Sequence, residues 1–134
     1  MITDERMKQI LEDTNTIAVV GLSDNPARAS HQVAKYLLDA GYRVIPVNPN
    51  AVEIFGEKAY SSLTDIKEQV DIVNVFRRSE TVMPIAQEAA QIHAKVFWLQ
   101  LGIENKEAAD LSSQHGMDVI MNRCIKIEHA RLLK

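Results

Sequence analysis

Five short apolar segments recur along the chain and predict a buried parallel sheet. Each is about five residues long, rich in valine and isoleucine, and almost uninterrupted by polar residues. They span residues 16–20, 43–47, 71–75, 95–99 and 117–121. Continuous rather than alternating hydrophobicity is typical of strands that are covered on both faces, as in a parallel sheet between two layers of helices.

The segments between these strands carry apolar residues at helical spacing. The residues predicted to share a helix face are Val33, Leu37 and Leu38 in the first helix, Val82, Ile85, Ala86, Ala89, Ala90 and His93 in the second, and Ala108, Leu111 and His115 in the third. Amphipathic patterns predict two further helices over residues 4–12 and 125–132. Regular alternation of strand and helix indicates βαβ units with right-handed crossovers. We therefore predict a single domain over residues 1–134, with a three-layer Rossmann-like α/β fold and a five-stranded, mainly parallel sheet.

Glycine, proline and polar residues set the expected ends of these elements. Gly41 and Gly116 each follow a helical segment and are expected to close it in a left-handed conformation. Pro46 has no N–H for a ladder hydrogen bond, so its strand either ends near Ile45 or places the proline nitrogen at a non-pairing position. We expect the strand to end there. The expected helix N-caps are Ser30, Ser79 or Thr81, and Asn105.

Composition narrows the class of protein. The chain has 134 residues, 46% of them hydrophobic and 25% charged, and a net charge of −3, which indicates about one domain and excludes a disordered chain. Cys124 is the single cysteine, and the four histidines lack metal-ligand spacing, so we expect neither a disulfide nor a metal site. A mixed-charge N-terminus, the lack of a long apolar run and mild acidity predict a cytoplasmic protein that binds neither membranes nor nucleic acid.

The loops after the strands are where a ligand is expected, because open parallel sheets bind ligands at the carboxyl ends of their strands. In the first loop, Gly21 would allow the backbone to approach a ligand closely. The helix that follows would present free N–H groups to a phosphate, with Ser23 and Arg28 as further donors. The alternative is structural: Gly21 only ends a strand, and Ser30 only caps a helix.

Standard nucleotide motifs are incomplete in this loop. A dinucleotide fingerprint would need glycine at the positions of Ser23 and Pro26. NAD-binding proteins usually carry an acidic residue after the second strand, where this chain has Asn48. A small NAD(P)-dependent oxidoreductase or redox regulator therefore stays as an alternative, and we assign no catalytic residue.

The loop after the third strand supplies a second set of candidate ligand contacts. Phe76 would stack on a base, and Arg77 or Arg78 would pair with a phosphate. Alternatively, Phe76 belongs to the core and one arginine pairs with Glu80. Cys124 follows the last strand at the same edge, either as a structural residue or as a thiol that faces the ligand.

Five motifs in this order resemble the small stand-alone CoA-binding domain family, which is similar to the nucleotide-binding domain of the succinyl-CoA synthetase α subunit. They are TIAVVGLS at residues 16–23, VIPVNP at 44–49, VDIVNVFRRSE at 70–80, WLQLGI at 98–103 and NRCIKIEH at 122–129. The resemblance implies a Rossmann-like sheet that holds coenzyme A or acyl-CoA at its carboxyl edge, without catalysis of its own. Because the chain ends at residue 134, we do not expect the ligase domain of the synthetase. A protein-interaction module that binds no nucleotide is a third possibility.

The same resemblance implies a role for each candidate residue. Gly21, Ser23 and Arg28 would face the phosphates, close to Ser30. The adenosine end would lie by Asn48 and Pro49, and the nucleotide would be bordered by Phe76, Arg77 and Arg78. Gln100 and Gly102 would line the pantetheine side, with Cys124 nearby.

Overall fold

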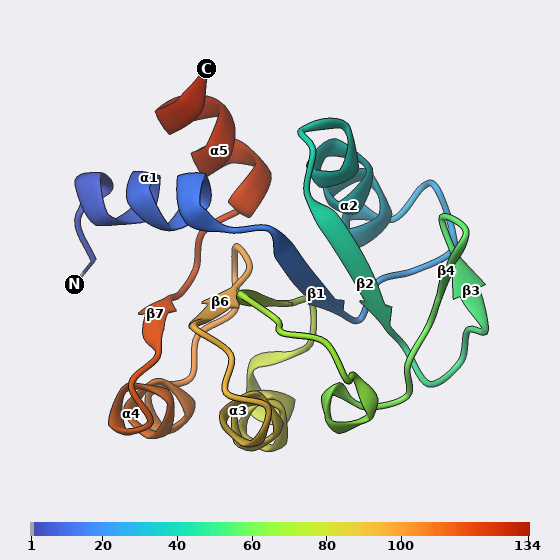
Figure 1. Cartoon of the computed structure of the whole chain (residues 1–134). Helices are drawn as coiled ribbons and strands as arrows, with labels where there is room; N and C mark the ends of the chain where they lie inside the picture. Colours follow the sequence, from blue (N-terminus) through green and yellow to red (C-terminus); the bar gives the residue numbers. More distant parts are fainter. Residues whose placement is uncertain (1) are drawn as a thin grey trace.

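A parallel sheet runs through the centre of the molecule (Figure 1). The computed structural model describes residues 2–134, and in this part of the chain the sheet has five strands in the order β2-β1-β5-β6-β7. The strands are β1 (Thr16–Val20), β2 (Arg43–Val47), β5 (Ile72–Val75), β6 (Val96–Leu99) and β7 (Asp118–Ile120). All four pairings between neighbours are parallel. The predicted α/β sheet is therefore confirmed, with one residue fewer at the start of β5, at the start of β6 and at each end of β7.

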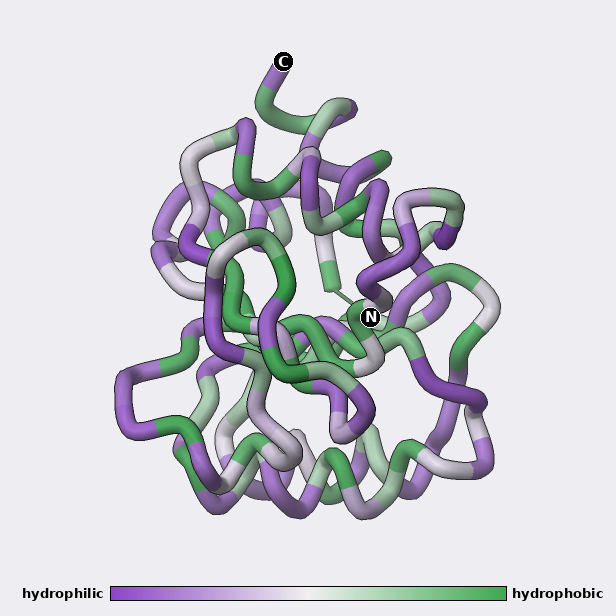
Figure 2. The backbone as a smooth tube through the Cα atoms, turned by 90° about the vertical axis from the view of Figure 1, so that its right-hand side faces the viewer, coloured by the Kyte–Doolittle hydropathy of each residue, from purple (hydrophilic) through white to green (hydrophobic). Residues whose placement is uncertain are grey.

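Helices cover both faces of this sheet. They are α1 (Asp4–Asp13), α2 (Ala29–Asp39), α3 (Val82–Gln91), α4 (Lys106–Gln114) and α5 (Ile125–Leu133). Figure 1 shows α1, α2 and α5 on one face and α3 and α4 on the other. Along β1, Ile17 and Val19 pack into the core under α1, α2 and α5, whereas Ala18 and Val20 pack into the core beneath α3 and α4. Burial on both faces explains the uninterrupted apolar segments, which lie inside the molecule in Figure 2.

Pro46 does not end its strand, so the prediction of a strand end at Ile45 is wrong. β2 continues to Val47, and Pro46 is paired in register with Val19. The strand tolerates proline because β2 lies at the edge of the sheet. The carbonyl oxygen of Pro46 accepts a hydrogen bond from Tyr60 N at 3.0 Å, whereas that of Val47 accepts one from Gly21 N at 2.8 Å. Pro46 therefore faces the outer edge, where the missing N–H breaks no ladder bond, which is the alternative that the sequence left open.

Ser30 is not the N-cap of α2, which corrects a second prediction. The helix begins at Ala29, its N-cap position is Arg28, and no side chain caps it. Ser30 is buried, and its Oγ accepts a hydrogen bond from Ser23 N at 3.0 Å. The hydroxyl therefore ties the helix to the preceding loop instead of capping it.

Other predicted helix ends are confirmed. Asn105 caps α4, since its Oδ1 accepts a hydrogen bond from Ala108 N at 2.9 Å. Thr81 occupies the N-cap position of α3 but makes no side-chain cap bond. Gly41 and Gly116 have φ angles of +102° and +83°, the left-handed conformation expected after a helix.

Hydrogen bonds and ion pairs join the three helices on one face. Tyr42 Oη donates to Leu11 O at 2.6 Å, and burial raises the pKa of Tyr42 to about 12. The hydroxyl of Tyr36 on α2 lies 2.8 Å from Nδ1 of His129 on α5. Arg131 forms a two-pronged ion pair with Asp4 at 2.8 and 2.9 Å. The positions of α2 and α5 relative to each other are thus fixed by specific contacts.

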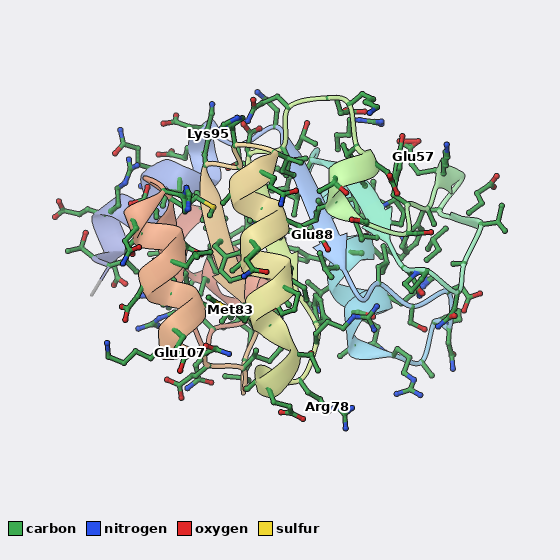
Figure 3. All side chains as sticks on the ribbon, turned by 90° about the horizontal axis from the view of Figure 1, so that it is seen from below. Glu57, Arg78, Met83, Glu88, Lys95 and Glu107 are labelled. Carbon is green, nitrogen blue, oxygen red and sulfur yellow. The ribbon has the colours of Figure 1, made fainter. Side chains whose placement is uncertain are left out.

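On the opposite face of the sheet, α3 is joined by hydrogen bonds to a short 3₁₀ helix, η1 (Leu63–Asp65), which precedes β5. Oε1 of Glu88 on α3 accepts hydrogen bonds from Ser62 Oγ at 2.8 Å and from Leu63 N at 3.1 Å. Figure 3 shows Glu88 on the side of α3 that faces this segment. Preceding η1, β3 (Glu53–Ile54) and β4 (Glu57–Lys58) form a small antiparallel hairpin.

Among residues 2–134, no helix has the length and apolar composition needed to cross a membrane. Within the same range, no three His, Cys, Asp or Glu side chains gather closely enough to hold a metal ion.

Candidate functional site

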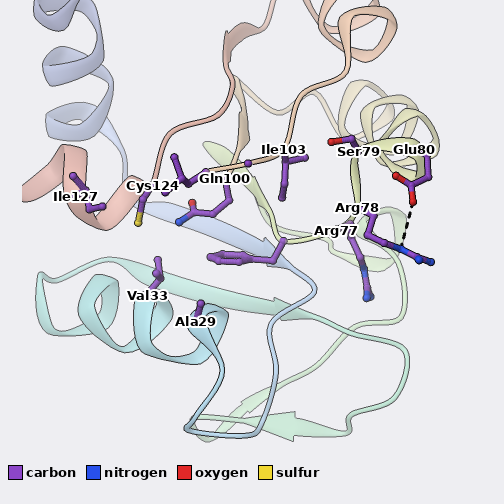
Figure 4. A pocket seen from close by; sticks show the side chains of 13 residues that line it. Ala29, Val33, Arg77, Arg78, Ser79, Glu80, Gln100, Ile103, Cys124 and Ile127 are labelled. Atoms are coloured by element: carbon purple, nitrogen blue, oxygen red, sulfur yellow. Dashed lines mark ion pairs between the residues drawn. The ribbon is translucent and has the colours of Figure 1, made fainter.

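A cavity of about 680 Å³ opens at the carboxyl edge of the sheet (Figure 4). It lies beyond the ends of β5 and β6 and is flanked by the first turns of α2 and α5. β1 is followed in sequence by its neighbour on one side, β2, and then by its neighbour on the other, β5. Such a reversal is where doubly wound α/β proteins bind their ligands. The volume is in the ~300–1,000 Å³ range of small-molecule sites.

Half of the predicted site residues line this cavity, which we call the edge pocket. They are Phe76, Arg77, Arg78, Gln100, Gly102 and Cys124. Three different strands deliver them, because each residue lies in a loop that directly follows β5, β6 or β7. The structure thus brings together residues up to 48 positions apart, from Phe76 to Cys124.

Gly21 supports the pocket without lining it. Its φ is +87°, and a Cβ atom there would lie 2.4 Å from the carbonyl oxygen of Phe76. Phe76 N in turn donates to Val20 O at 2.8 Å. The loops that follow β1 and β5 therefore pack backbone against backbone at this point. Only glycine fits at this position. The sequence predicted that the backbone at Gly21 would approach a ligand closely, whereas in the structure it approaches another loop of the protein.

One end of the edge pocket is cationic. Arg78 Nε lies 3.5 Å from Glu80 Oε1, but both side chains are exposed, so this ion pair is weak. Arg77 makes no ion pair or side-chain hydrogen bond with any residue in the range 2–134. A second hollow of about 430 Å³, lined by Phe76, both arginines, Thr81 and Ile85, adjoins the same segment. The guanidinium of Arg77 is thus available to an anion on either side, and that of Arg78 is held only by this exposed ion pair.

The other end is apolar and was missed by the sequence analysis. Ala29 and Val33 from α2 and Ile127 from α5 line this end (Figure 4). Leu101 and Ile103, from the loop after β6, are further apolar residues of the lining. Leu101 is 62% exposed and Ile127 is 56% exposed, which is high for large apolar side chains. The available signal was positional: Ile127 lies off the buried face of α5, and Leu101 lies two residues after the end of the buried strand β6.

Gln100 lines the edge pocket and is hydrogen-bonded to Asn74 in the sheet. The residue is buried, and its Oε1 accepts hydrogen bonds from Asn74 Nδ2 at 3.2 Å and from Ile125 N at 3.3 Å. Asn74 is fully buried in the middle of β5, and its Oδ1 has no hydrogen-bond partner among residues 2–134. Cys124 occupies the N-cap position of α5 next to this network and is partly buried.

A second pair of residues holds the loops after β6 and β7 together. Gly102 N donates to Asn122 Oδ1 at 2.6 Å, and Asn122 has a φ of +57°. Asparagine tolerates this left-handed conformation better than most residues do. Asn122 was not among the predicted site residues, although it precedes Cys124 by only two positions.

The remaining predicted residues lie at the same edge but outside the lining of the edge pocket. Asn48 and Ser23 use their side chains locally: Asn48 Nδ2 donates to Leu22 O at 2.9 Å, and Ser23 Oγ accepts from Asn25 N at 3.0 Å. Ser30 binds the backbone of Ser23, as described above. Arg28 and Pro49 are exposed. Their contacts with a ligand remain predictions.

Comparison with known proteins now decides the family. Residues 15–130 match the model of a family described as "CoA binding domain". The chain belongs to this family. The resemblance inferred from the five motifs is therefore confirmed.

Relatives in this family fall into two groups by length. The Bacillus subtilis protein YneT is 52% identical over 92% of each chain. The α subunit of acetate–CoA ligase (ADP-forming) II from Pyrococcus furiosus is 30% identical over 87% of this chain, but the match covers 28% of that protein. Among solved structures, a protein from Pyrococcus horikoshii OT3 superposes with a TM-score of 0.96 and 39% identity, over 99% of this chain and 94% of the other.

Proposed function

We propose that this protein binds coenzyme A at the carboxyl edge of the sheet. The observation that carries the proposal is the polarity of the edge pocket, which is cationic at the Arg77 and Arg78 end and apolar at the Ile127 end (Figure 4). Coenzyme A has the same division, because a nucleotide with three phosphate groups continues into an uncharged pantetheine arm.

The residues present suit each half of such a ligand. Arg77 and Arg78 supply charge-assisted donors for phosphate, and the start of α2 adds backbone N–H groups that no side chain caps. Exposed Arg28 precedes this helix, and we propose that it contacts the same phosphates. Membership of the CoA-binding domain family supports the proposal, as does the name of the ligase subunit that shares this domain.

The proposal is one of binding, and we assign no catalytic residue. The P. furiosus ligase subunit continues well beyond the shared domain, so its reaction is not transferred to this chain. We also propose, as the sequence analysis did, that the protein acts in the cytoplasm.

Thermal denaturation with a panel of nucleotides tests the proposal. We expect the melting temperature to rise with CoA concentration, because a ligand that binds only the folded state stabilises it by mass action. NAD, NADP and ADP are each tested separately at the same concentrations for comparison. A larger shift with NAD or NADP would instead support the oxidoreductase alternative, and a chain that responds to none of them would fit an interaction module.

Two arginine variants then locate the phosphates. Arg77→Ala and Arg28→Ala should each weaken CoA binding by roughly tenfold, since a hydrogen bond to a charged group contributes ~1.5–3 kcal/mol. Lys67→Ala is the matched control, because it removes one exposed positive charge at the opposite edge of the sheet. Equal affinities for all three variants would contradict the assignment of the cationic end.

A further inference from the structure

Helices α2 and α5 face each other across the apolar end of the edge pocket. Ala29 and Val33 line this end from α2 (Figure 4). Ile127 lines it from α5, and Cys124 lines it at the N-cap position of the same helix. The separation of the two helices therefore sets the width of the pocket, and the contacts that hold α5 against α2 determine its shape.

A buried histidine makes the hydrogen bond that joins these two helices. Nδ1 of His129 on α5 lies 2.8 Å from Oη of Tyr36 on α2, the only hydrogen bond between α2 and α5 among residues 2–134. The imidazole also packs edge to face with the rings of Tyr36 and Tyr42, at centroid separations of 5.4 and 5.7 Å. His129 is 8% exposed and does not line the edge pocket. It can therefore affect the pocket only through the position of α5.

Two lysines of the C-terminal segment surround this contact with positive charge. Nζ of Lys126 and Nζ of Lys134 lie 5.7 and 4.7 Å from the centre of the Tyr36 ring, which is the ring that His129 contacts. Burial and the charge of Lys134 hold the pKa of His129 below its usual value. Protonation would place a third positive charge at a buried position in this cluster, which is unfavourable.

No carboxylate compensates a positive charge on the imidazole. The preceding residue, Glu128, has its carboxylate between Arg123 and Arg131, at 3.0 and 2.7 Å. The acidic group of α1 that acts on the cluster is Glu12, which is exposed and raises the pKa of Tyr42, after burial and Tyr36. Within residues 2–134, His129 forms no ion pair. The cost of protonation therefore falls on the contact between α5 and α2.

Acidification leaves the attachment of α5 to α1 in place. Arg131 on α5 forms a two-pronged ion pair with Asp4 on α1, at 2.8 and 2.9 Å. The pKa of Asp4 is lowered, chiefly by its hydrogen bond to Arg131, so Asp4 stays ionised at the pH at which an imidazole takes up a proton. Since α5 stays tied to α1 while its contact with α2 weakens, the two walls of the pocket separate.

We propose that the contact between His129 and Tyr36 is a pH-sensitive switch, in which protonation of the imidazole moves α5 away from α2 and opens the apolar end of the edge pocket. Acidification then lowers the affinity of the pocket for its ligand, and because coupling is reciprocal, ligand binding expels the proton. The effect on affinity rests on the proposed function, because CoA is the probe. The movement of α5 is independent of it.

Trp98 reports the movement in the absence of ligand. It is the single tryptophan of the chain, it is fully buried, and its Nε1 donates at 2.9 Å to the carbonyl of Arg123, two residues before α5 begins. Between pH 7.5 and pH 5.5 we expect its fluorescence emission to shift to longer wavelength as the indole loses this partner and meets water. Far-UV circular dichroism verifies that the fold persists over the same range.

Two variants assign the shift to the proposed contact. His129→Gln should abolish it, because glutamine can hydrogen-bond to Tyr36 but does not titrate. Tyr36→Phe keeps the ring and removes the hydrogen bond, so its emission at pH 7.5 should already resemble that of the wild type in acid. His115→Gln is the matched control, since His115 is exposed at the end of α4 on the opposite face of the sheet.

Isothermal titration calorimetry with CoA provides the second readout. One proton that binds below pH 6.5 changes an equilibrium by at most about tenfold over one pH unit. We therefore expect CoA to bind the wild type roughly five- to tenfold more weakly at pH 5.5 than at pH 7.5. The phosphates of CoA titrate as well, and their contribution is the change that remains in His129→Gln. The difference between the two proteins measures the switch.

The outcomes distinguish failure of the switch from failure of the proposed function. A Trp98 shift that is absent, or equal in the wild type and His129→Gln, overturns the switch whether or not CoA binds. If CoA binds at neither pH, the proposed function is wrong, and the fluorescence alone decides whether α5 moves. If Trp98 shifts as expected but CoA affinity has the same pH dependence in both proteins, α5 moves without controlling the pocket and the coupling is overturned.

Discussion

Replacing Gly21 by alanine tests the packing that positions the edge pocket. Two costs add at this position. A φ of +87° is unfavourable for any residue with a Cβ atom, by ~1 kcal/mol. In addition, the new atom would lie 2.4 Å from the carbonyl oxygen of Phe76, about 1 Å closer than ordinary contact, and relief of such an overlap costs ~1–3 kcal/mol.

Gly116→Ala isolates the first cost. Gly116 has a φ of +83°, and a Cβ atom there meets nothing within 4 Å. We therefore expect a loss of about 1 kcal/mol in the free energy of unfolding for Gly116→Ala and about 3 kcal/mol for Gly21→Ala. For a chain of this length these losses correspond to roughly 3–5 °C and 10–15 °C in melting temperature.

Urea denaturation of both variants measures the difference directly. A second readout is CoA affinity. In Gly21→Ala the new Cβ atom would displace the Phe76 carbonyl and with it the adjoining Arg77, whereas Gly116→Ala leaves both in place. We expect weaker binding for Gly21→Ala alone. If both variants lose the same stability within about 0.5 kcal/mol, the Phe76 backbone yields freely and the close approach of the two loops does not position the pocket.

Three further changes test contacts elsewhere in the fold. Tyr42→Phe leaves the buried carbonyl of Leu11 without its donor and should cost ~1–2 kcal/mol of unfolding free energy in urea. In wild-type protein, the raised pKa of Tyr42, about 12, means that stability declines as pH rises from about 10 to 12, which unfolding at several pH values will show. Burial and the nearby Lys134 lower the pKa of His129, so its neutral form is favoured on folding; stability should fall as pH drops below about 6.5, and less so in His129→Gln. Glu88→Gln keeps an acceptor for Leu63 N and should be nearly neutral by thermal denaturation, whereas Glu88→Ala should cost ~1–2 kcal/mol.

The architecture was predictable because burial on both faces leaves a direct mark in the sequence. Segments such as residues 16–20 have no polar alternation, and only a sheet between two helical layers buries every position. The same topology predicts part of the site. Phe76, Gln100 and Cys124 each follow a strand end, and parallel strands bring those ends to one edge.

The incorrect predictions involve partners that local patterns do not specify. Ser30 has the residue type of an N-cap, but the loop folds back and places Ser23 N against its hydroxyl. Pro46 is compatible with its strand only because β2 forms the edge, which depends on the order of all the strands. Leu101 and Ile127 were missed because single exposed apolar residues are common on protein surfaces and carry no signal by themselves.

The two edges of the sheet differ in how well their polar and apolar groups are satisfied, and this contrast locates function independently of any motif. At the amino edge, Asp71 accepts hydrogen bonds from two backbone N–H groups and lies 3.5 Å from the ammonium of Lys95. At the carboxyl edge, the guanidinium of Arg77 has no ion pair or side-chain hydrogen bond within residues 2–134, and the apolar side chains of Leu101 and Ile127 are exposed. A ligand with acceptors and apolar groups that binds there would pair with the guanidinium and cover the apolar side chains. Natural sequences retain such local conflicts mainly where function requires them. The carboxyl edge is therefore the surface on which substitutions should affect binding more than stability.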